Sequence, residues 1–108
     1  MKEYLFAYGT LQDAAVQEYV FQRTLEGQQD ALPGYVISAK KMYDRYLVLE
    51  AGHKPEDEVH GMSYRLGAQD LLKADVYEGP AYSRIRLSLK SGRIAWVYLE
   101  KTRTEQAE

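Results

Sequence analysis

Short apolar runs alternate with polar and glycine-containing segments along this chain, and their spacing predicts the order of its elements. Residues 4–8 form an apolar run that stops at Gly9, a pattern typical of a buried strand. Between residues 12 and 21 apolar side chains recur at helical spacing, and Asp13 stands where it can cap the helix. We therefore expect the chain to begin with a strand and a short helix.

The middle of the chain carries weaker signals. Pro33-Gly34 punctuates the sequence, and an extended pattern resumes over residues 35–39. Residues 46–49 form another short apolar run, which ends at the turn-like segment 51–57. Two short strands are therefore expected in this region.

The second half of the chain is dominated by strand patterns. Residues 59–66 and 94–99 are predicted strands, and residues 68–76 form a short helix that follows the first of them. Residues 83–90 alternate with a period of two, placing apolar side chains on one face and arginines on the other. Ser91-Gly92 supplies the turn into the last strand.

About six strands and two short helices, with no repeat, low-complexity segment or linker, indicate an α+β domain with a mixed sheet that curls. The length of 108 residues fits one domain. We expect a single domain over residues 1–100 and a polar C-terminal tail over residues 101–108.

Composition and charge narrow the classes of partner. The chain has 14 Lys and Arg against 16 Asp and Glu, and its longest basic run is Lys40-Lys41. This is far from a polybasic patch, so neither nucleic acid nor a membrane is an expected partner. No apolar stretch is long enough for a membrane span, and no signal peptide precedes the first strand, so we expect a cytoplasmic protein.

Several chemistries are excluded or disfavoured by the residue types present. The chain has no cysteine and two histidines, which excludes disulfides, thiol nucleophiles and thiolate zinc sites and disfavours a histidine metal centre. The sequence contains no Gly-x-Ser-x-Gly elbow, dinucleotide fingerprint or phosphate loop. Tyrosine is over-represented, with ten copies, and suits half-buried strands and pocket walls.

The first segment with chemical potential is Tyr8-Gly9-Thr10-Leu11, which joins the first strand to the first helix. Gly9 gives the backbone freedom, and the N–H groups that follow can converge on an anion or oxyanion. The alternative is an ordinary tight turn in which Thr10 caps the helix.

The second segment runs from Asp75 to Tyr82 and places Glu78 among tyrosines and apolar side chains, next to Gly79-Pro80. Burial raises the pKa of such a carboxyl group toward the range where it can act as a general acid–base. The alternative is that Glu78 is a solvated residue at a helix end and that Asp75 makes a surface hydrogen bond.

Three further candidates are weaker. The acidic run at residues 56–58 is more typical of a solvated turn than of a metal site. His60, in an apolar strand, is expected to be a core residue rather than a catalyst. Arg84 and Arg86 could bind an anionic ligand or could simply face solvent.

Taken together, these segments resemble the gamma-glutamylcyclotransferase-like family. The resemblance extends from Tyr4 to Leu99, and its separate motifs occur in the family's order and spacing. The matching segments are Phe6-Ala7-Tyr8-Gly9-Thr10-Leu11, Val59-His60-Gly61-Met62-Ser63-Tyr64, Asp75-Val76-Tyr77-Glu78-Gly79, Tyr82-Ser83-Arg84 and the closing strand Ala95-Trp96-Val97-Tyr98. The chain departs from the family pattern at Ala74, where leucine is usual, and at Tyr46-Leu47, where many members carry Tyr-Pro.

The resemblance implies a small mixed β-barrel with helices packed outside, and release of 5-oxoproline from a gamma-glutamyl amino acid or amine without metal or cofactor. It implies that Glu78 is the general acid–base. The implied substrate-binding residues are Tyr8, Gly9, Thr10, Leu11 and Tyr82. Two other hypotheses remain open: a non-catalytic ligand-binding or interaction protein on the same fold, and acyl transfer on another amide. The leaving group and the oligomeric state are not specified by the sequence.

Overall fold

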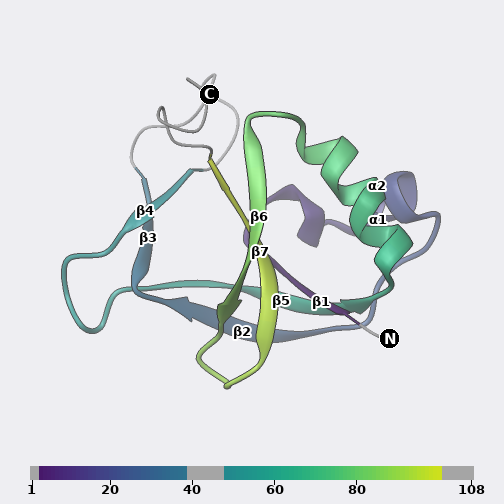
Figure 1. Ribbon diagram of the computed structural model, residues 1–108. Coiled ribbons are helices and arrows are strands. Elements are labelled where there is room, and N and C mark those ends of the chain that lie inside the picture. The colour runs from purple at the N-terminus through teal and green to yellow at the C-terminus, as the bar shows by residue number, and fades with distance from the viewer. Residues whose placement is uncertain (1–2, 39–47, 101–108) are drawn as a thin grey trace.

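The computed structural model describes residues 3–38 and 48–100 (Figure 1). In this part of the chain, two α-helices and one short 3-10 helix accompany seven strands. The strands are β1 (Glu3–Ala7), β2 (Gly27–Pro33), β3 (Tyr35–Ile37), β4 (Leu49–Ala51), β5 (Glu58–Leu66), β6 (Tyr82–Ser88) and β7 (Ile94–Glu100). The helices are η1 (Thr10–Gln12, the 3-10 helix), α1 (Ala14–Phe21) and α2 (Ala68–Glu78).

Strand β1 is the central strand of a five-stranded sheet with the order β2-β5-β1-β7-β6. It pairs antiparallel with β5 along its whole length, from Glu3 opposite Leu66 to Ala7 opposite Met62. With β7 it shares a single parallel pair, Leu5 opposite Trp96. Because so short a ladder leaves the strands free to diverge, β6 and β7 run crosswise to β1, β2 and β5 (Figure 1).

The alternation of side chains along β1 divides the interior into two hydrophobic cores. Leu5 and Ala7 lie in the core covered by α1 and α2, whereas Phe6 lies in the opposite core, which is covered by β4. All three side chains are buried. This arrangement explains why residues 4–8 are apolar at consecutive positions rather than at every second one.

Close contact between β1 and β5 requires a glycine. A Cβ added to Gly61 would collide with the Ala7 carbonyl oxygen and would lie 2.8 Å from the Phe6 ring. Gly61 therefore lets the end of β1 pack tightly against β5, and it fixes the point from which the chain enters the loop after β1.

The sheet curls but does not close, so the expectation of a barrel is wrong in that respect while the α+β class is confirmed. Among the described residues, the edge strands β2 and β6 form no ladder with each other. Strand β2 is bonded to the turn that follows β6, where Lys90 N–H donates to the Ala31 carbonyl and the Ser91 hydroxyl donates to Asp30 Oδ2. The curl therefore ends in a local contact instead of a continuous ring of strands.

The sequence-based elements are largely confirmed. The predicted strands at 4–8, 59–66, 83–90 and 94–99 and both helices are present with small shifts in their bounds. In the middle of the chain, β3 lies within the predicted strand 35–39, whereas β4 (Leu49–Ala51) shares only Leu49 with the predicted strand 46–49 and extends into the expected turn. Residues 39, 46 and 47 and the tail 101–108 lie outside the described residues. Strand β2 was not predicted, and neither was η1.

Helices α1 and α2 lie side by side on one side of the sheet, opposite the small β3–β4 sheet (Figure 1). Val20, Phe21, Leu71 and Ala74 are their buried contributions to the core. In the described parts of the chain, neither helix is long and apolar enough to cross a membrane.

Asp13 begins α1 as predicted. Its Oδ1 accepts hydrogen bonds from the N–H groups of Ala15 at 2.8 Å and Val16 at 3.4 Å, so it satisfies donors that have no partner within the helix.

Replacing the Asp13 cap should therefore destabilise the protein. We expect Asp13→Ala to lower the free energy of unfolding by about 1 kcal/mol in urea denaturation. Asp13→Asn is the matched control because its amide oxygen can still accept both bonds, and it should cost only a few tenths of that amount. Equal losses for the two variants would contradict the capping role.

Candidate active site

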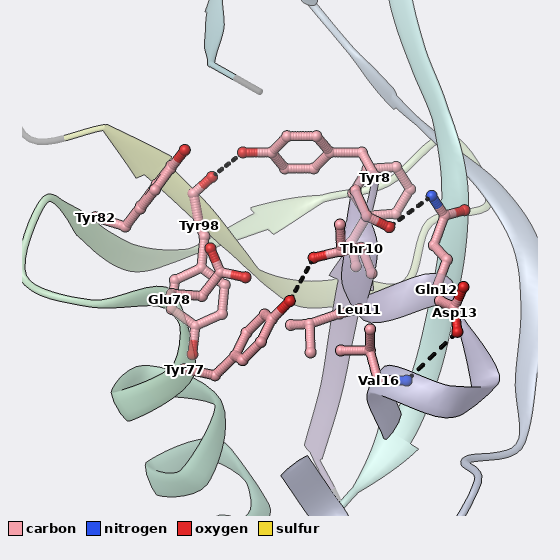
Figure 2. Close-up of a pocket in the computed structure, with 13 residues that line it drawn as sticks. Tyr8, Thr10, Leu11, Gln12, Asp13, Val16, Tyr77, Glu78, Tyr82 and Tyr98 are labelled. Atoms are coloured by element: carbon pink, nitrogen blue, oxygen red, sulfur yellow. Dashed lines mark hydrogen bonds between the residues drawn. The ribbon is translucent and has the colours of Figure 1, made fainter. Parts of the chain in front are cut away.

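A cavity of about 630 Å³ opens between the C-terminal end of β1 and the C-terminal end of α2. The loop of residues 8–11 forms one wall, and Tyr77, Glu78, Tyr82 and Tyr98 form the facing wall (Figure 2). All six residues to which the family resemblance assigns catalysis or substrate binding line this cavity: Tyr8, Gly9, Thr10, Leu11, Glu78 and Tyr82. Segments far apart in the chain are thus brought together.

The loop wall is built from the end of β1 and the single turn of η1. Gly9 has φ −130°, so its conformation does not require the left-handed region. The N–H groups of Thr10 and Leu11 open the 3-10 turn, where a helix supplies no acceptor for its first donors. Both residues line the cavity, so these N–H groups are candidate donors to a ligand there.

Thr10 does not cap α1, so that alternative is wrong; Asp13 does so instead. The hydroxyl groups of Thr10 and Tyr77 are hydrogen-bonded at 2.7 Å, which ties the loop directly to α2 across the cavity (Figure 2). Gln12 closes the turn, since its side-chain amide donates to the Gly9 carbonyl at 3.2 Å.

Glu78 is the last residue of α2, and Gly79, with φ 88°, ends the helix in a conformation that favours glycine. The carboxyl group points into the cavity (Figure 2). Among the described residues no hydrogen bond reaches this carboxyl group, and burial alone raises its pKa from 4.5 to about 7. Glu78 does stand at a helix end, but it is not simply solvated.

Three more tyrosines line the cavity: Tyr82 and Tyr98 on the facing wall, and Tyr8 at the end of β1. The Tyr8 hydroxyl donates to the Tyr98 carbonyl at 2.6 Å, which joins β1 to β7 beyond their single ladder pair. Burial raises the pKa of Tyr8, with smaller contributions from Tyr82 and Glu78, and burial also raises the pKa of Tyr98. Tyr8 and Tyr98 therefore face the cavity as neutral rings with polar tips.

Asp75 lies one helical turn before Glu78 but does not line this cavity. Its carboxylate accepts a bidentate pair of hydrogen bonds from Arg84, at 2.7 and 3.0 Å, and a third from the Tyr98 hydroxyl at 2.6 Å. Burial acts to raise the pKa of Asp75, but these hydrogen bonds and the Arg84 charge outweigh it, so the pKa is lowered. Asp75 therefore joins α2 to two strands through three hydrogen bonds, instead of making one surface hydrogen bond.

The weaker candidates lie away from the cavity. The expectation that His60 is a core residue is wrong. Its side chain is 81% exposed and pairs with Glu58, because β5 turns this position outward. Arg84 stacks on Trp96 and pairs with Asp75, so it does not simply face solvent, whereas Arg86 is exposed. Among the described residues, no three His, Asp or Glu side chains are grouped so as to hold a metal ion.

Sequence reasoning missed several residues that line the cavity: Phe6, Ala7, Gln12, Asp13, Val16, Tyr77 and Tyr98. Gln12 and Asp13 directly follow the candidate loop, and Tyr77 precedes Glu78, so proximity in sequence was an available signal. Tyr98 lies in the closing strand that matches the family, but that strand is apolar and typical of core, so its pattern did not mark Tyr98 as a cavity residue.

The fold is shared with several solved structures. The chain matches solution structures of two Arabidopsis thaliana proteins. For the first, the TM-score is 0.77 at 19% identity, over 99% of this chain and 73% of the other. For the second, the TM-score is 0.76 at 21% identity, over 98% and 80%. A structure of a gamma-glutamyl cyclotransferase matches with a TM-score of 0.71 at 15% identity, over 94% of this chain and 68% of that one.

These identities are low, so the structural matches establish the fold alone. Comparison with curated proteins found no match. The family comparison is more specific: the model of the gamma-glutamyl cyclotransferase, AIG2-like family matches residues 5–108, which is almost the whole chain. With its sheet, its two helices and the cavity between β1 and α2 in place, this chain belongs to the gamma-glutamyl cyclotransferase, AIG2-like family.

Proposed function

We propose that this protein is a gamma-glutamyl cyclotransferase that releases 5-oxoproline from a gamma-glutamyl amino acid or amine. The observation that carries the proposal is that the half-buried Glu78 carboxyl group faces the loop of residues 8–11 across one cavity. Membership of the family supports the same reaction class. The cavity has room for a small amino-acid derivative and is lined mainly by aromatic and apolar side chains.

The reaction needs a base because the substrate's α-amino group titrates near 8 and is largely protonated at neutral pH. In the proposed reaction the α-amine loses a proton to Glu78 and its nitrogen attacks the γ-carbonyl carbon. A new C–N bond closes the five-membered ring, and Glu78 gives the first proton to the leaving nitrogen as the original γ-amide bond breaks. Glu78 then takes the second proton from the ring nitrogen and passes it to the departing amine, which leaves as its ammonium ion. The products are 5-oxoproline and the released amine, and no water, metal or redox partner is consumed.

Because nucleophile and electrophile belong to one molecule, the protein's main contribution is to hold a folded conformer of the substrate. In our proposal the N–H groups of Thr10 and Leu11 bind either the substrate carboxylate or the developing oxyanion. Tyr8 and Tyr82 pack against the gamma-glutamyl moiety and limit the access of water.

The direct test is to incubate the protein with a panel of gamma-glutamyl dipeptides and gamma-glutamyl amines and to measure 5-oxoproline. We expect turnover of at least one substrate, and we expect Glu78→Gln to reduce kcat by about a hundredfold or more, because an amide cannot carry the proton. Glu18→Gln on the exposed surface of α1 is the matched control and should retain activity.

Two results would contradict this assignment. Normal turnover by Glu78→Gln would remove Glu78 from the proton transfer. No product from any substrate, combined with a thermal shift by a gamma-glutamyl compound that is recovered unchanged, would favour a non-catalytic ligand-binding protein. Turnover of a different amide instead would indicate another acyl transfer on the same site.

The pH dependence follows from the burial of Glu78. Since its pKa is raised to about 7, we expect kcat/KM to fall as the pH decreases through about 7, with a slope that indicates one proton. The measurement is a pH–rate profile between about pH 5 and pH 9. An acid limb near the ordinary glutamate pKa of 4.5 would contradict the assigned base.

Glu78 should also make the stability depend on pH. Its folded-state pKa of about 7 lies above the ordinary 4.5, so the stability it contributes is fully present below 4.5 and is lost as the pH rises through 7. Glu78→Gln should therefore be more stable than the unmodified protein by roughly 2 to 3 kcal/mol at about pH 8, and nearly equal at about pH 4. Urea denaturation at both pH values measures this. A constant difference would show that Glu78 is not buried as a charge.

A further inference from the structure

The proposed reaction requires the Glu78 carboxyl group to be held in place in the cavity, and this needs a structural cause. Among the described residues no side chain or backbone group is hydrogen-bonded to it. It also stands at the end of a helix, where the chain turns away through Gly79. Helix ends fray when nothing fixes them, and a frayed end would let water reach the carboxyl group.

Two contacts hold this end of α2: the Tyr77 hydroxyl is hydrogen-bonded to Thr10 on the loop side, and Asp75, one turn before Glu78, is bonded to the sheet. The Arg84 fork donates from β6 to both carboxylate oxygens, and the Tyr98 hydroxyl donates from β7 to Oδ1. Three charge-assisted hydrogen bonds from two strands therefore fasten the last turn of α2 to the sheet. The Arg84 side chain is 19% exposed and its guanidinium lies 4.4 Å from the Trp96 ring centroid, whereas the Asp75 side chain is 38% exposed.

Tyr98 extends this network to the opposite wall of the cavity. Its hydroxyl binds Asp75, its ring lines the cavity and its carbonyl accepts the Tyr8 hydroxyl. One residue thus connects the helix that carries Glu78 with the strand end that carries the loop of residues 8–11. A shift of Asp75 would be transmitted to both walls at once.

From this geometry we infer that Asp75 is a positioning residue, which acts through Arg84 and Tyr98 to hold Glu78 in the cavity and away from water. Asp75 does not line the cavity, so it has no contact with substrate there. This inference rests on the proposed function for its effect on turnover, but its structural effect can be measured without any substrate.

The surroundings of Glu78 show what should change when Asp75 is lost. The titratable groups on the walls around Glu78 are mainly tyrosines, and Asp75 is itself paired with Arg84. The titratable residues on the elements packed around it are Tyr8 after β1, Asp13 before α1, Asp75 and Tyr77 on α2, Tyr82 and Arg84 on β6, and Tyr98 on β7. The pKa of Glu78 therefore depends chiefly on the exclusion of water, which the anchored helix end provides.

The experiment is an NMR titration of the Glu78 carboxyl carbon in the full chain, together with the pH–rate profile. In Asp75→Ala all three hydrogen bonds are lost, and we expect the Glu78 pKa to fall by at least about one unit as water enters. We also expect kcat to fall about tenfold or more, with a smaller change in KM, because the base is misplaced.

Asp75→Asn separates position from charge. Both Arg84 Nε and the Tyr98 hydroxyl bind Oδ1, so an asparagine oxygen can keep these two bonds while the negative charge is removed. Asp75→Asn should therefore keep the Glu78 pKa close to that of the unmodified protein. A drop as large as that of Asp75→Ala would mean that the charge of Asp75, not its anchoring, affects Glu78, and would overturn the inference.

Asp70→Ala is the matched control on the same helix. Asp70 also binds an arginine fork, from Arg23 at 2.9 and 2.7 Å, but near the N-terminal end of α2 and away from the cavity. This variant should be less stable yet leave the Glu78 titration unchanged. If it moved the titration as much as Asp75→Ala does, the effect would be a general loosening of α2, and the positioning role would fail.

Tyr98→Phe provides a second variant if Asp75→Ala does not fold. It removes one anchoring hydrogen bond and keeps the ring, so it should lower the Glu78 pKa by a smaller amount than Asp75→Ala does. An unchanged Glu78 pKa in Tyr98→Phe would overturn the inference.

If the unmodified protein makes no 5-oxoproline but the titrations behave as expected, the proposed function fails and the positioning role stands. Turnover by the unmodified protein with an unchanged Glu78 titration in Asp75→Ala would support the proposed function and overturn the positioning role.

Discussion

The structure depends on a central strand that must be buried on both faces. Because Leu5 and Ala7 pack under the helices and Phe6 packs on the opposite side, β1 lies between the two cores and cannot slip without exposing apolar surface. Its short ladder with β7 lets the sheet bend, and the bend opens the cavity at the end of β1. The loop of residues 8–11 is thus positioned by core packing.

Helix α2 places the Glu78 carboxyl group at the same cavity, at the end of β1. Ala74 is completely buried, so α2 lies close to the sheet, and the helix ends at the edge of the cavity. The family usually has leucine at this position, and the smaller side chain here is accommodated within the helix-side core. Among the described residues nothing is hydrogen-bonded to the Glu78 carboxyl group, and its desolvation is unfavourable for stability, which is the expected trade where a group is tuned for proton transfer.

Local sequence patterns predicted most of this fold because they report burial and caps directly. They failed at β2, where Gln28, Gln29 and Asp30 are polar and only Ala31 and Leu32 are buried, as suits an edge strand. They also failed to predict whether the sheet closes, since closure depends on long-range pairing of strand edges. In the site, the motifs identified Glu78 and the loop, but the Tyr98–Asp75–Arg84 network joins three elements and leaves no local pattern.

The central claim is that Glu78 and the loop after β1 form one binding site for the gamma-glutamyl moiety. Titration of the ¹⁵N- and ¹³C-labelled protein with 5-oxoproline, the proposed product, tests this most directly. We expect the amide signals of Gly9, Thr10 and Leu11 to shift together with the carboxyl signal of Glu78, with one common affinity. Shifts confined to residues away from this cavity, while these four signals remain unchanged, would contradict it.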